Sequence, residues 1–120
     1  MRGKSKRSLG LEAEDAACRF LQEKGFQLIE RNVRSLSGEI DVLARDGRTL
    51  VVVEVRRRSA PSVVSTGELV PPAKRRKIVQ VAREVVGKYM RPGDSLRFDV
   101  VVVTDEGGAL SCLHIESAFG

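Results

Sequence analysis

The fold of this chain is decided by residues 38–56, which read GEIDVLARDGRTLVVVEVR. Two runs of strand-forming residues, 38–44 and 50–56, lie on either side of the dipeptide Asp46-Gly47. An Asp-Gly pair between two such runs is the strongest short-range signal for a β-hairpin. We therefore expect an antiparallel pair of strands joined by a tight turn at this dipeptide.

Side chains alternate between the two faces of a strand, and this alternation sorts the residues of the hairpin. In the first run, Ile40 and Val42 are expected on one face and Glu39 and Asp41 on the other. In the second run, the valines at odd positions are expected to face the core.

The second run leaves Glu54 and Arg56 on the face opposite its core valines. A loop centred on residues 47–48 places Asp41 directly opposite Glu54, with their Cβ atoms about 4.5–5.5 Å apart. Two carboxylates at that separation can share one Mg²⁺ at its usual ligand distance of about 2.0–2.1 Å. Equally, they can pair with Arg56 and Arg45 as surface ion pairs, and spacing alone favours neither interpretation.

The remaining elements follow from periodicity and from turn residues. Apolar residues recur at helical spacing over about 9–24, where Ser8 is the expected N-cap and Gly25 the stop, and again over about 72–90. Further strands are expected at 26–34, 96–103 and 110–115. Residues 58–70 lack periodicity, which predicts a surface loop that can move.

The resulting element order is αβββαββ, which predicts an α/β fold with a mixed sheet of about five strands. The segment from strand 50–56 through helix 72–90 to strand 96–103 is a βαβ crossover, so these two strands should be parallel with a right-handed connection. One helix is expected on each face of the sheet. We expect a basic N-terminal arm over residues 1–7 and a single domain over 8–120.

Composition narrows the class of protein. Lysine and arginine number 21 against 16 aspartates and glutamates, and the formal net charge of +5 modestly favours a polyanionic partner. Apolar residues make up 42%, which is enough for a core. Cys18 and Cys112 lack metal-site spacing, and no apolar run approaches the roughly 20 residues that span a bilayer. We expect a cytoplasmic protein with free thiols and no membrane partner.

Basic residues cluster beside the predicted acidic site. They follow the second hairpin strand and open the second helix: Arg57, Arg58, Lys74, Arg75, Arg76 and Lys77. We expect these side chains to hold phosphates, with salt-dependent and largely sequence-independent binding. Four cations at a helix N-terminus oppose the helix dipole, which favours a bound phosphate over a merely solvated helix start.

Five short motifs lie in order along the chain: GLEAEDAA at 10–17, RN at 31–32, GEID at 38–41, VEVR at 53–56 and RFDV at 97–100. In this order and spacing the chain resembles the YraN family of small bacterial predicted endonucleases, and the resemblance covers roughly residues 8–119. That family is placed in the restriction-endonuclease-like PD-(D/E)XK superfamily, with distant similarity to archaeal Holliday junction resolvases. The resemblance implies a three-layer α/β/α fold, an endonuclease acting on DNA and, by analogy only, a homodimer.

The resemblance also implies roles for particular residues. Glu14 matches the helix carboxylate of the family, Asp41 its motif aspartate, and Glu54 the acidic residue of its E-X-K element. In such nucleases these side chains bind Mg²⁺ or Mn²⁺, which polarises the scissile phosphate and lowers the pKa of a water molecule. Asp99 belongs to a further motif, and either pairs with its neighbour Arg97 or lies near the carboxylates.

One departure bears on activity, because Arg56 stands where the family's E-X-K element has lysine. Arginine stays charged in proteins, so Arg56 can stabilise a phosphate electrostatically but cannot deprotonate water. Lys74, at the start of the second helix, is the alternative cation that can approach the site.

Three functions are compatible with these residues. The first is a metal-dependent endonuclease that hydrolyses phosphodiester bonds, in DNA by resemblance. The second is a DNA-binding module that keeps the nuclease fold but has weak or lost cleavage because of Arg56. The third is a structural or interaction protein whose carboxylates only form salt bridges.

Overall fold

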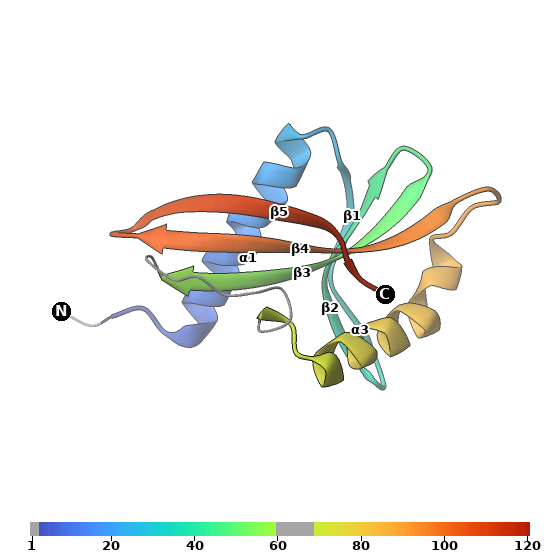
Figure 1. Cartoon of the computed structure of the whole chain (residues 1–120), viewed down its shortest axis with the longest axis horizontal. Helices are drawn as coiled ribbons and strands as arrows, with labels where there is room; N and C mark the ends of the chain where they lie inside the picture. The colour runs from blue at the N-terminus through green and yellow to red at the C-terminus, as the bar shows by residue number, and fades with distance from the viewer. Residues whose placement is uncertain (1–2, 60–68) are drawn as a thin grey trace.

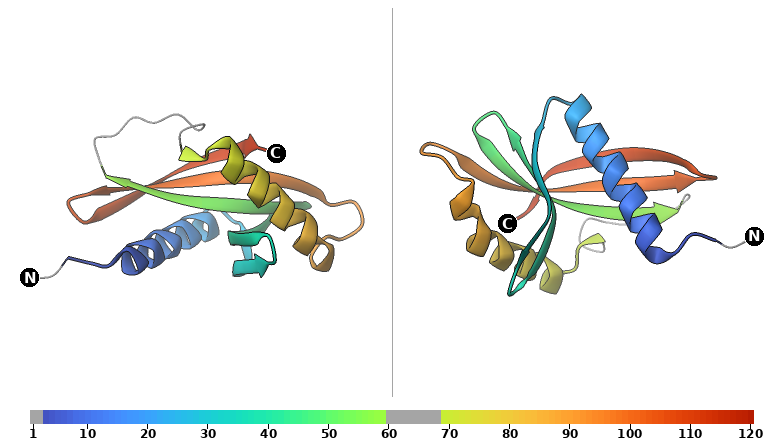
Figure 2. Two further views of the ribbon diagram at one scale, coloured as in Figure 1. Left: turned by 90° about the horizontal axis from the view of Figure 1, so that it is seen from below. Right: turned by 180° about the vertical axis from the view of Figure 1, so that it is seen from behind.

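A computed structural model describes residues 3–59 and 69–120 of the chain (Figure 1). In chain order its elements are α1 (Lys6–Glu23), β1 (Gln27–Ser35), β2 (Gly38–Asp46), β3 (Thr49–Ser59), α3 (Pro72–Val85), the 3₁₀ turn η1 (Val86–Lys88), β4 (Ser95–Glu106) and β5 (Ala109–Phe119). Figure 2 shows α1 and α3 on opposite faces of the sheet. The predicted α/β class, the three layers and the order αβββαββ are therefore confirmed.

The five strands form one mixed sheet in the order β1-β2-β3-β4-β5. β3 and β4 are parallel, as the predicted crossover requires, and the other neighbours are antiparallel. β3 and β4 lie between strands on both sides and under helices on both faces. This position explains their nearly continuous runs of valine, because neither face needs polar side chains.

Two apolar clusters hold the layers together. On one face, Leu50 and Val52 of β3 pack with the buried residues of α3. On the other face, Val51 and Val53 pack with the buried residues of α1. Both clusters are almost entirely aliphatic, so β3 fastens both helices to the sheet through alternate side chains.

The first helix begins earlier than its apolar periodicity predicts. Ser5, not Ser8, is the N-cap, and its side chain accepts a hydrogen bond from the Ser8 backbone N–H. The first turn is exposed and carries no apolar pattern, so only the capping bond marks its start. Lys6 and Arg7, expected in the basic arm, therefore belong to α1. Its predicted end is confirmed, because Gly25 has a φ of 95°.

The second helix is shorter than the predicted 72–90. It ends as an α-helix at Val85, and one 3₁₀ turn follows that contains Gly87, a residue of low helix propensity. β3 extends to Ser59, so the first part of the loop expected at 58–70 is strand, and residues 60–68 lie outside the described residues. No helix in the described part of the chain is long and apolar enough to cross a membrane.

The β1–β2 hairpin bends in the middle, which the alternation pattern does not predict. Ile40 packs in the α3 cluster and Val42 in the α1 cluster, so the expectation that they share a face is wrong. The bend coincides with Asn32, which has a left-handed φ of 54° and lies in β1 between the residues paired with Ile40 and Val42. The kink lets the hairpin tip fold towards α3.

We predict that position 32 tolerates only residues that adopt this backbone conformation. Asn32→Gly should leave the free energy of unfolding nearly unchanged, whereas Asn32→Val should lower it by about 1–2 kcal/mol, because a β-branched residue is strained at positive φ. Urea unfolding followed by circular dichroism measures both. Gln27→Val, in the extended part of the same strand, is the control, and an equally small effect of both valines would contradict the prediction.

Candidate functional site

The sheet opens between β2 and β3, and this opening creates the site. The last ladder pair of the two strands is Val42 with Val53. Beyond it β2 continues beside β1 as far as Gly38, and β3 continues beside β4 as far as Ser59. The next residues in register are Asp41 and Glu54, so both carboxylates lie where the two strands part.

Asp41 closes the end of the ladder with its own side chain. Its Oδ2 accepts a hydrogen bond of 2.9 Å from the Val55 backbone N–H. Glu54 follows Leu50 and Val52 on one face of β3, and only 4% of its surface is exposed. The prediction that Asp41 and Glu54 meet across the hairpin agrees with this geometry, because both follow the Val42–Val53 pair in register and line the same pocket.

The electrostatics of this pair are unfavourable to two negative charges. Burial, then the charge of Asp41, raises the pKa of Glu54 to about 7. Burial likewise raises the pKa of Asp41, although the hydrogen bond from Val55 opposes that shift. Lys74 of α3 lines the same pocket, and its positive charge lowers the pKa of each carboxylate, as the charge of Arg56 does for Glu54. The pair therefore favours a nearby cation.

An open pocket of about 320 Å³ surrounds the pair, and we call it the acidic pocket. It is bounded by α1, by the parting ends of β2 and β3, and by the start of α3. Its lining residues are Gly10, Ala13, Glu14, Asp41, Glu54, Val55, Arg56, Arg57 and Lys74. All four predicted catalytic residues, including Arg56, thus line one pocket to which three layers contribute.

Glu14 reaches this pocket from α1 but is engaged by an arginine. Its Oε1 lies 3.3 Å from Nη2 of Arg31, which also donates to Asp15. Among residues 3–59 and 69–120, no three acidic, histidine or cysteine side chains come close enough to form a ready-made metal cluster. Asp41 and Glu54 are therefore brought together, whereas Glu14 lines the same pocket with one of its oxygens held by Arg31.

The donor set nevertheless suits a hard divalent cation. Mg²⁺ and Mn²⁺ prefer carboxylate oxygens and are commonly held by one or two carboxylates with water completing the shell. Asp41 and Glu54 supply such oxygens in a pocket open to solvent. A cation between them would also offset the repulsion that raises both pKa values.

Arg56 lies beside Glu54 without a close bond to it. Its Nε is 3.7 Å from Glu54 Oε1, and this buried nitrogen has no hydrogen-bond partner among the described residues. Arg45, the other arginine considered as a surface partner, is buried and pairs with Asp94 at 2.7 Å. The ion-pair interpretation is therefore wrong for Arg45 and weak for Arg56.

Glu39 and Asp99, the other two acidic residues considered from the sequence, do not line the acidic pocket. Glu39 bonds to Arg34 at 3.1 Å, although its charge still contributes to the raised pKa of Asp41. Asp99 is fully buried and bonds to Arg97 and to His114. It lies beside Val53 in the β3–β4 pairing, on the α1 face and not on the Glu54 face. Of the two placements left open for Asp99, pairing with Arg97 is confirmed.

The predicted basic cluster is divided among several places. Arg57 bonds to Asp105 and to the Leu9 carbonyl, and Arg58 bonds to Thr104. On α3, Lys74 lines the acidic pocket and the stem of Lys77 lies beside Gly38 of the hairpin tip. Arg75 and Arg76 line a different pocket on the other side of the helix. The six predicted cations therefore do not form one phosphate-binding patch within the described part of the chain.

Two residues that position the site were not singled out by the sequence. Arg31 holds Glu14, and Asn32 bends β1 beside Asp41. They form the RN motif at 31–32, which the family resemblance includes. That motif was the available signal, but neither the ion pair nor the positive φ can be derived from residue type alone.

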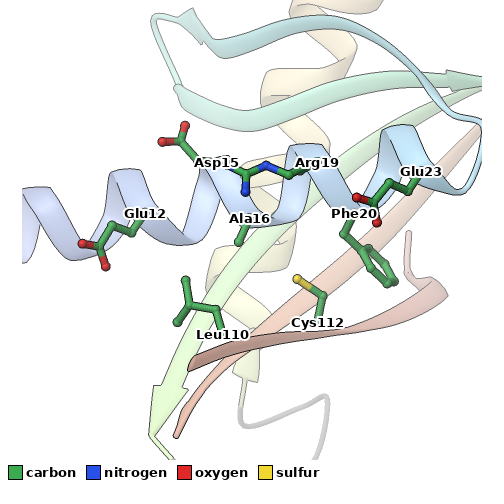
Figure 3. Close-up of a pocket in the computed structure, with 8 residues that line it drawn as sticks. All are labelled: Glu12, Asp15, Ala16, Arg19, Phe20, Glu23, Leu110 and Cys112. Carbon is green, nitrogen blue, oxygen red and sulfur yellow. The ribbon is translucent and has the colours of Figure 1, made fainter. Parts of the chain in front are cut away.

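A further pocket of about 420 Å³ lies between α1 and β5 (Figure 3). Carboxylates from α1 line it, but Glu12 pairs with Lys4 and Arg57, and Asp15 pairs with Arg31. These pairings balance the charge of both carboxylates. This pocket is therefore a weaker candidate than the acidic pocket.

Comparison with known proteins gives the following matches. The model of a family described as "Uncharacterised protein family UPF0102" matches residues 13–103. A UPF0102 protein of Anaeromyxobacter dehalogenans is 38% identical over 117 residues, which cover 98% of this chain and 87% of that protein. Another, from Desulforapulum autotrophicum, is 42% identical over 114 residues, which cover 95% of this chain and 94% of that protein. A solved structure titled "Structure of EndoMS-dsDNA2 complex" aligns with a TM-score of 0.42 and 20% identity, covering 72% of this chain and 34% of that one.

The raised pKa of Glu54 predicts an unusual dependence of stability on pH. Between its ordinary value of 4.5 and about 7, the folded protein binds this proton more tightly than the unfolded chain does. The free energy of unfolding of the metal-free protein should therefore fall as pH rises through this window, by up to about 3 kcal/mol. Urea unfolding in EDTA at a series of pH values measures the slope.

Glu54→Gln should remove most of this slope, because glutamine does not titrate. Glu106→Gln, which changes an exposed glutamate, should keep the wild-type slope. A wild-type protein whose stability rises with pH between about 5 and 7, relative to Glu54→Gln, would contradict the assignment.

Proposed function

We propose that this chain, which belongs to the uncharacterised protein family UPF0102, is a metal-dependent nuclease that hydrolyses phosphodiester bonds in DNA. The observation that carries the proposal is the meeting of Asp41 and Glu54 at the parting of β2 and β3, with Lys74 facing both. Buried carboxylates of raised pKa beside a lysine, in an open pocket, are typical of a catalytic site rather than of a stabilising ion pair.

Asp41 and Glu54 would hold the metal, and Glu14 would join them when it leaves Arg31. A bound Mg²⁺ or Mn²⁺ supplies Lewis-acid polarisation of the scissile phosphate and lowers the pKa of a water molecule. The hydrogen bond from the Val55 N–H fixes one oxygen of Asp41 and leaves its other oxygen for a ligand. The rigid ends of two β-strands thereby orient the two carboxylates.

The cations of the pocket have different roles. Arg56 stays charged, so its role is to neutralise negative charge on the phosphate as the bond breaks. Lys74 brings an ammonium group to both carboxylates from α3. It thereby supplies, from another element, the lysine that the E-X-K element lacks in this chain.

DNA as the substrate is supported by charge. The chain carries a net charge of +5, and the rim of the acidic pocket includes Arg56, Arg57 and Lys74. Contacts of this kind hold the phosphate backbone with little regard to sequence and weaken as salt is added. A second candidate function, DNA binding without cleavage, is favoured by one observation, the presence of Arg56 in the lysine position.

We predict that the acidic pocket binds a divalent cation. Calorimetric titration of the wild-type protein with MnCl₂ should show binding, and Asp41→Asn or Glu54→Gln should weaken the affinity by at least about tenfold, because each removes a charged oxygen ligand. Glu106→Gln, on the exposed surface, should bind like wild type. Absence of metal binding in the wild type would refute the metal-dependent nuclease.

Cleavage distinguishes the enzyme from the binding module. With nicked, branched and single-stranded DNA in Mn²⁺, we expect Lys74→Met to lower the cleavage rate by about 100-fold, as loss of one charge-stabilising group does elsewhere. Lys88→Met, which removes an exposed lysine outside the pocket, should cleave like wild type. Arg56→Lys should raise the rate.

Two results would contradict this assignment of roles. If the wild type does not cleave and Arg56→Lys does not restore cleavage, Arg56 is not what limits activity. If Lys74→Met cleaves as fast as Lys88→Met, the lysine of α3 does not act at the site.

A further inference from the structure

A second groove lies on the other side of α3 from the acidic pocket. It encloses about 660 Å³ between the helix and the end of β5. Arg75, Arg76 and Arg83 line it from the helix, and the apolar residues Val79 and Phe119 contribute to it from helix and strand. We call it the arginine groove, and it has twice the volume of the acidic pocket.

The helix geometry places charge at both ends of an apolar surface. Arg76 and Arg83 are seven residues apart, so they lie on one side of α3, separated by about 10 Å along its axis. Val79 lies between them and is half-buried against the same core as Phe119. Phe119 is itself held by Phe98, with ring centroids 5.4 Å apart.

The arginines of this groove lack acidic partners among the residues that the structure describes. No ion pair joins Arg75, Arg76 or Arg83 to a carboxylate side chain in that part of the chain, whereas Arg31, Arg45 and Arg57 are all paired. Arg75 donates through Nε to the Val70 carbonyl at 2.7 Å, which orients its guanidinium group. Among residues 3–59 and 69–120, therefore, no carboxylate side chain neutralises the three arginines of the groove.

We propose that the arginine groove binds a single-stranded segment of DNA adjoining the bond that the acidic pocket cleaves. This inference rests on the proposed function and names the substrate class, a duplex with an unpaired or branched strand. Phosphates would bind Arg76 and Arg83, and an unstacked base would lie over Val79 and Phe119. An aromatic side chain that lines a groove together with arginines suits exposed bases, because base stacking on aromatic rings tolerates any sequence.

The position of the groove supports a shared substrate. Lys74 lines the acidic pocket and Arg75, the next residue, lines the arginine groove, so the first turn of α3 separates the two. A strand that leaves the acidic pocket would therefore have to cross this turn to reach the groove. A continuous duplex gains less from the groove, because its bases are already stacked on one another.

Fluorescence anisotropy in EDTA tests the groove without any cleavage. The probe is a labelled oligothymidylate of about 20 nucleotides, compared with a duplex of the same length. Arg76→Gln/Arg83→Gln should weaken single-strand binding by about tenfold and reduce the salt slope by about 1.4, since each phosphate contact contributes about 0.7 for single strands. Phe119→Leu should weaken single-strand binding by about fivefold and duplex binding by less than about twofold.

The control Arg19→Gln/Lys88→Gln removes the same charge from exposed positions elsewhere. It should change single-strand binding by less than about threefold, because only general attraction is lost. Equal losses in the control and the groove variant would overturn the proposal. A Phe119→Leu variant that binds single strands normally would also overturn it. Displacement of the probe by polyglutamate as readily as by unlabelled oligothymidylate would do the same, and would indicate a site for an acidic peptide.

The two proposals fail in distinguishable ways. If the groove variants bind single strands like wild type while Asp41→Asn abolishes metal binding, the groove inference falls and the nuclease proposal stands. If the wild type binds no metal but the groove variants lose single-strand affinity selectively, the groove stands as a binding site and the nuclease proposal falls.

Discussion

The candidate site depends on one electrostatic constraint, the burial of two carboxyl groups at the point where β2 and β3 separate. Asp41 replaces the missing ladder partner of the Val55 N–H, so it cannot turn away from Glu54 without leaving a backbone donor unsatisfied. Glu54 cannot turn away either, because the strand alternation of β3 fixes its face. The backbone therefore holds together two groups that repel each other when both are ionised.

This repulsion explains why all three layers contribute to the site. The sheet alone places the carboxylates but supplies only Arg56, whose nearest approach to Glu54 is 3.7 Å. Lys74 comes from the start of α3, and the first helix contributes Glu14, restrained by Arg31. β3 carries apolar residues on both faces and packs against both helices. This packing lets a side chain from each helix reach the acidic pocket.

Sequence reasoning succeeded where local rules decide the geometry and failed where distant packing does. The Asp46-Gly47 turn sets the register of the hairpin, and that register brings Asp41 to Glu54. The alternation of Ile40 and Val42 fails because Asn32 adopts a positive φ, which bends the hairpin so that Ile40 packs with α3 and Val42 with α1. The partner of Arg45 is Asp94, which lies 49 residues further along the chain. The crossover through α3 brings the two residues together, so no local sequence rule could pair them.

The basic residues of α3 are a second case in which the sequence alone does not predict the arrangement of side chains, and this case bears on function. Residues 74–77 form one cluster in the sequence, but successive helix positions point in directions about 100° apart. The helix therefore directs Lys74 to the acidic pocket and Arg75 and Arg76 to the arginine groove. In the sequence these cations form one basic run, whereas in the structure α3 separates a pocket that contains carboxylates from a groove lined by arginines. The strand proposed above would cross the first turn of this helix to reach both, so the position of α3 relative to the sheet would set the distance between them.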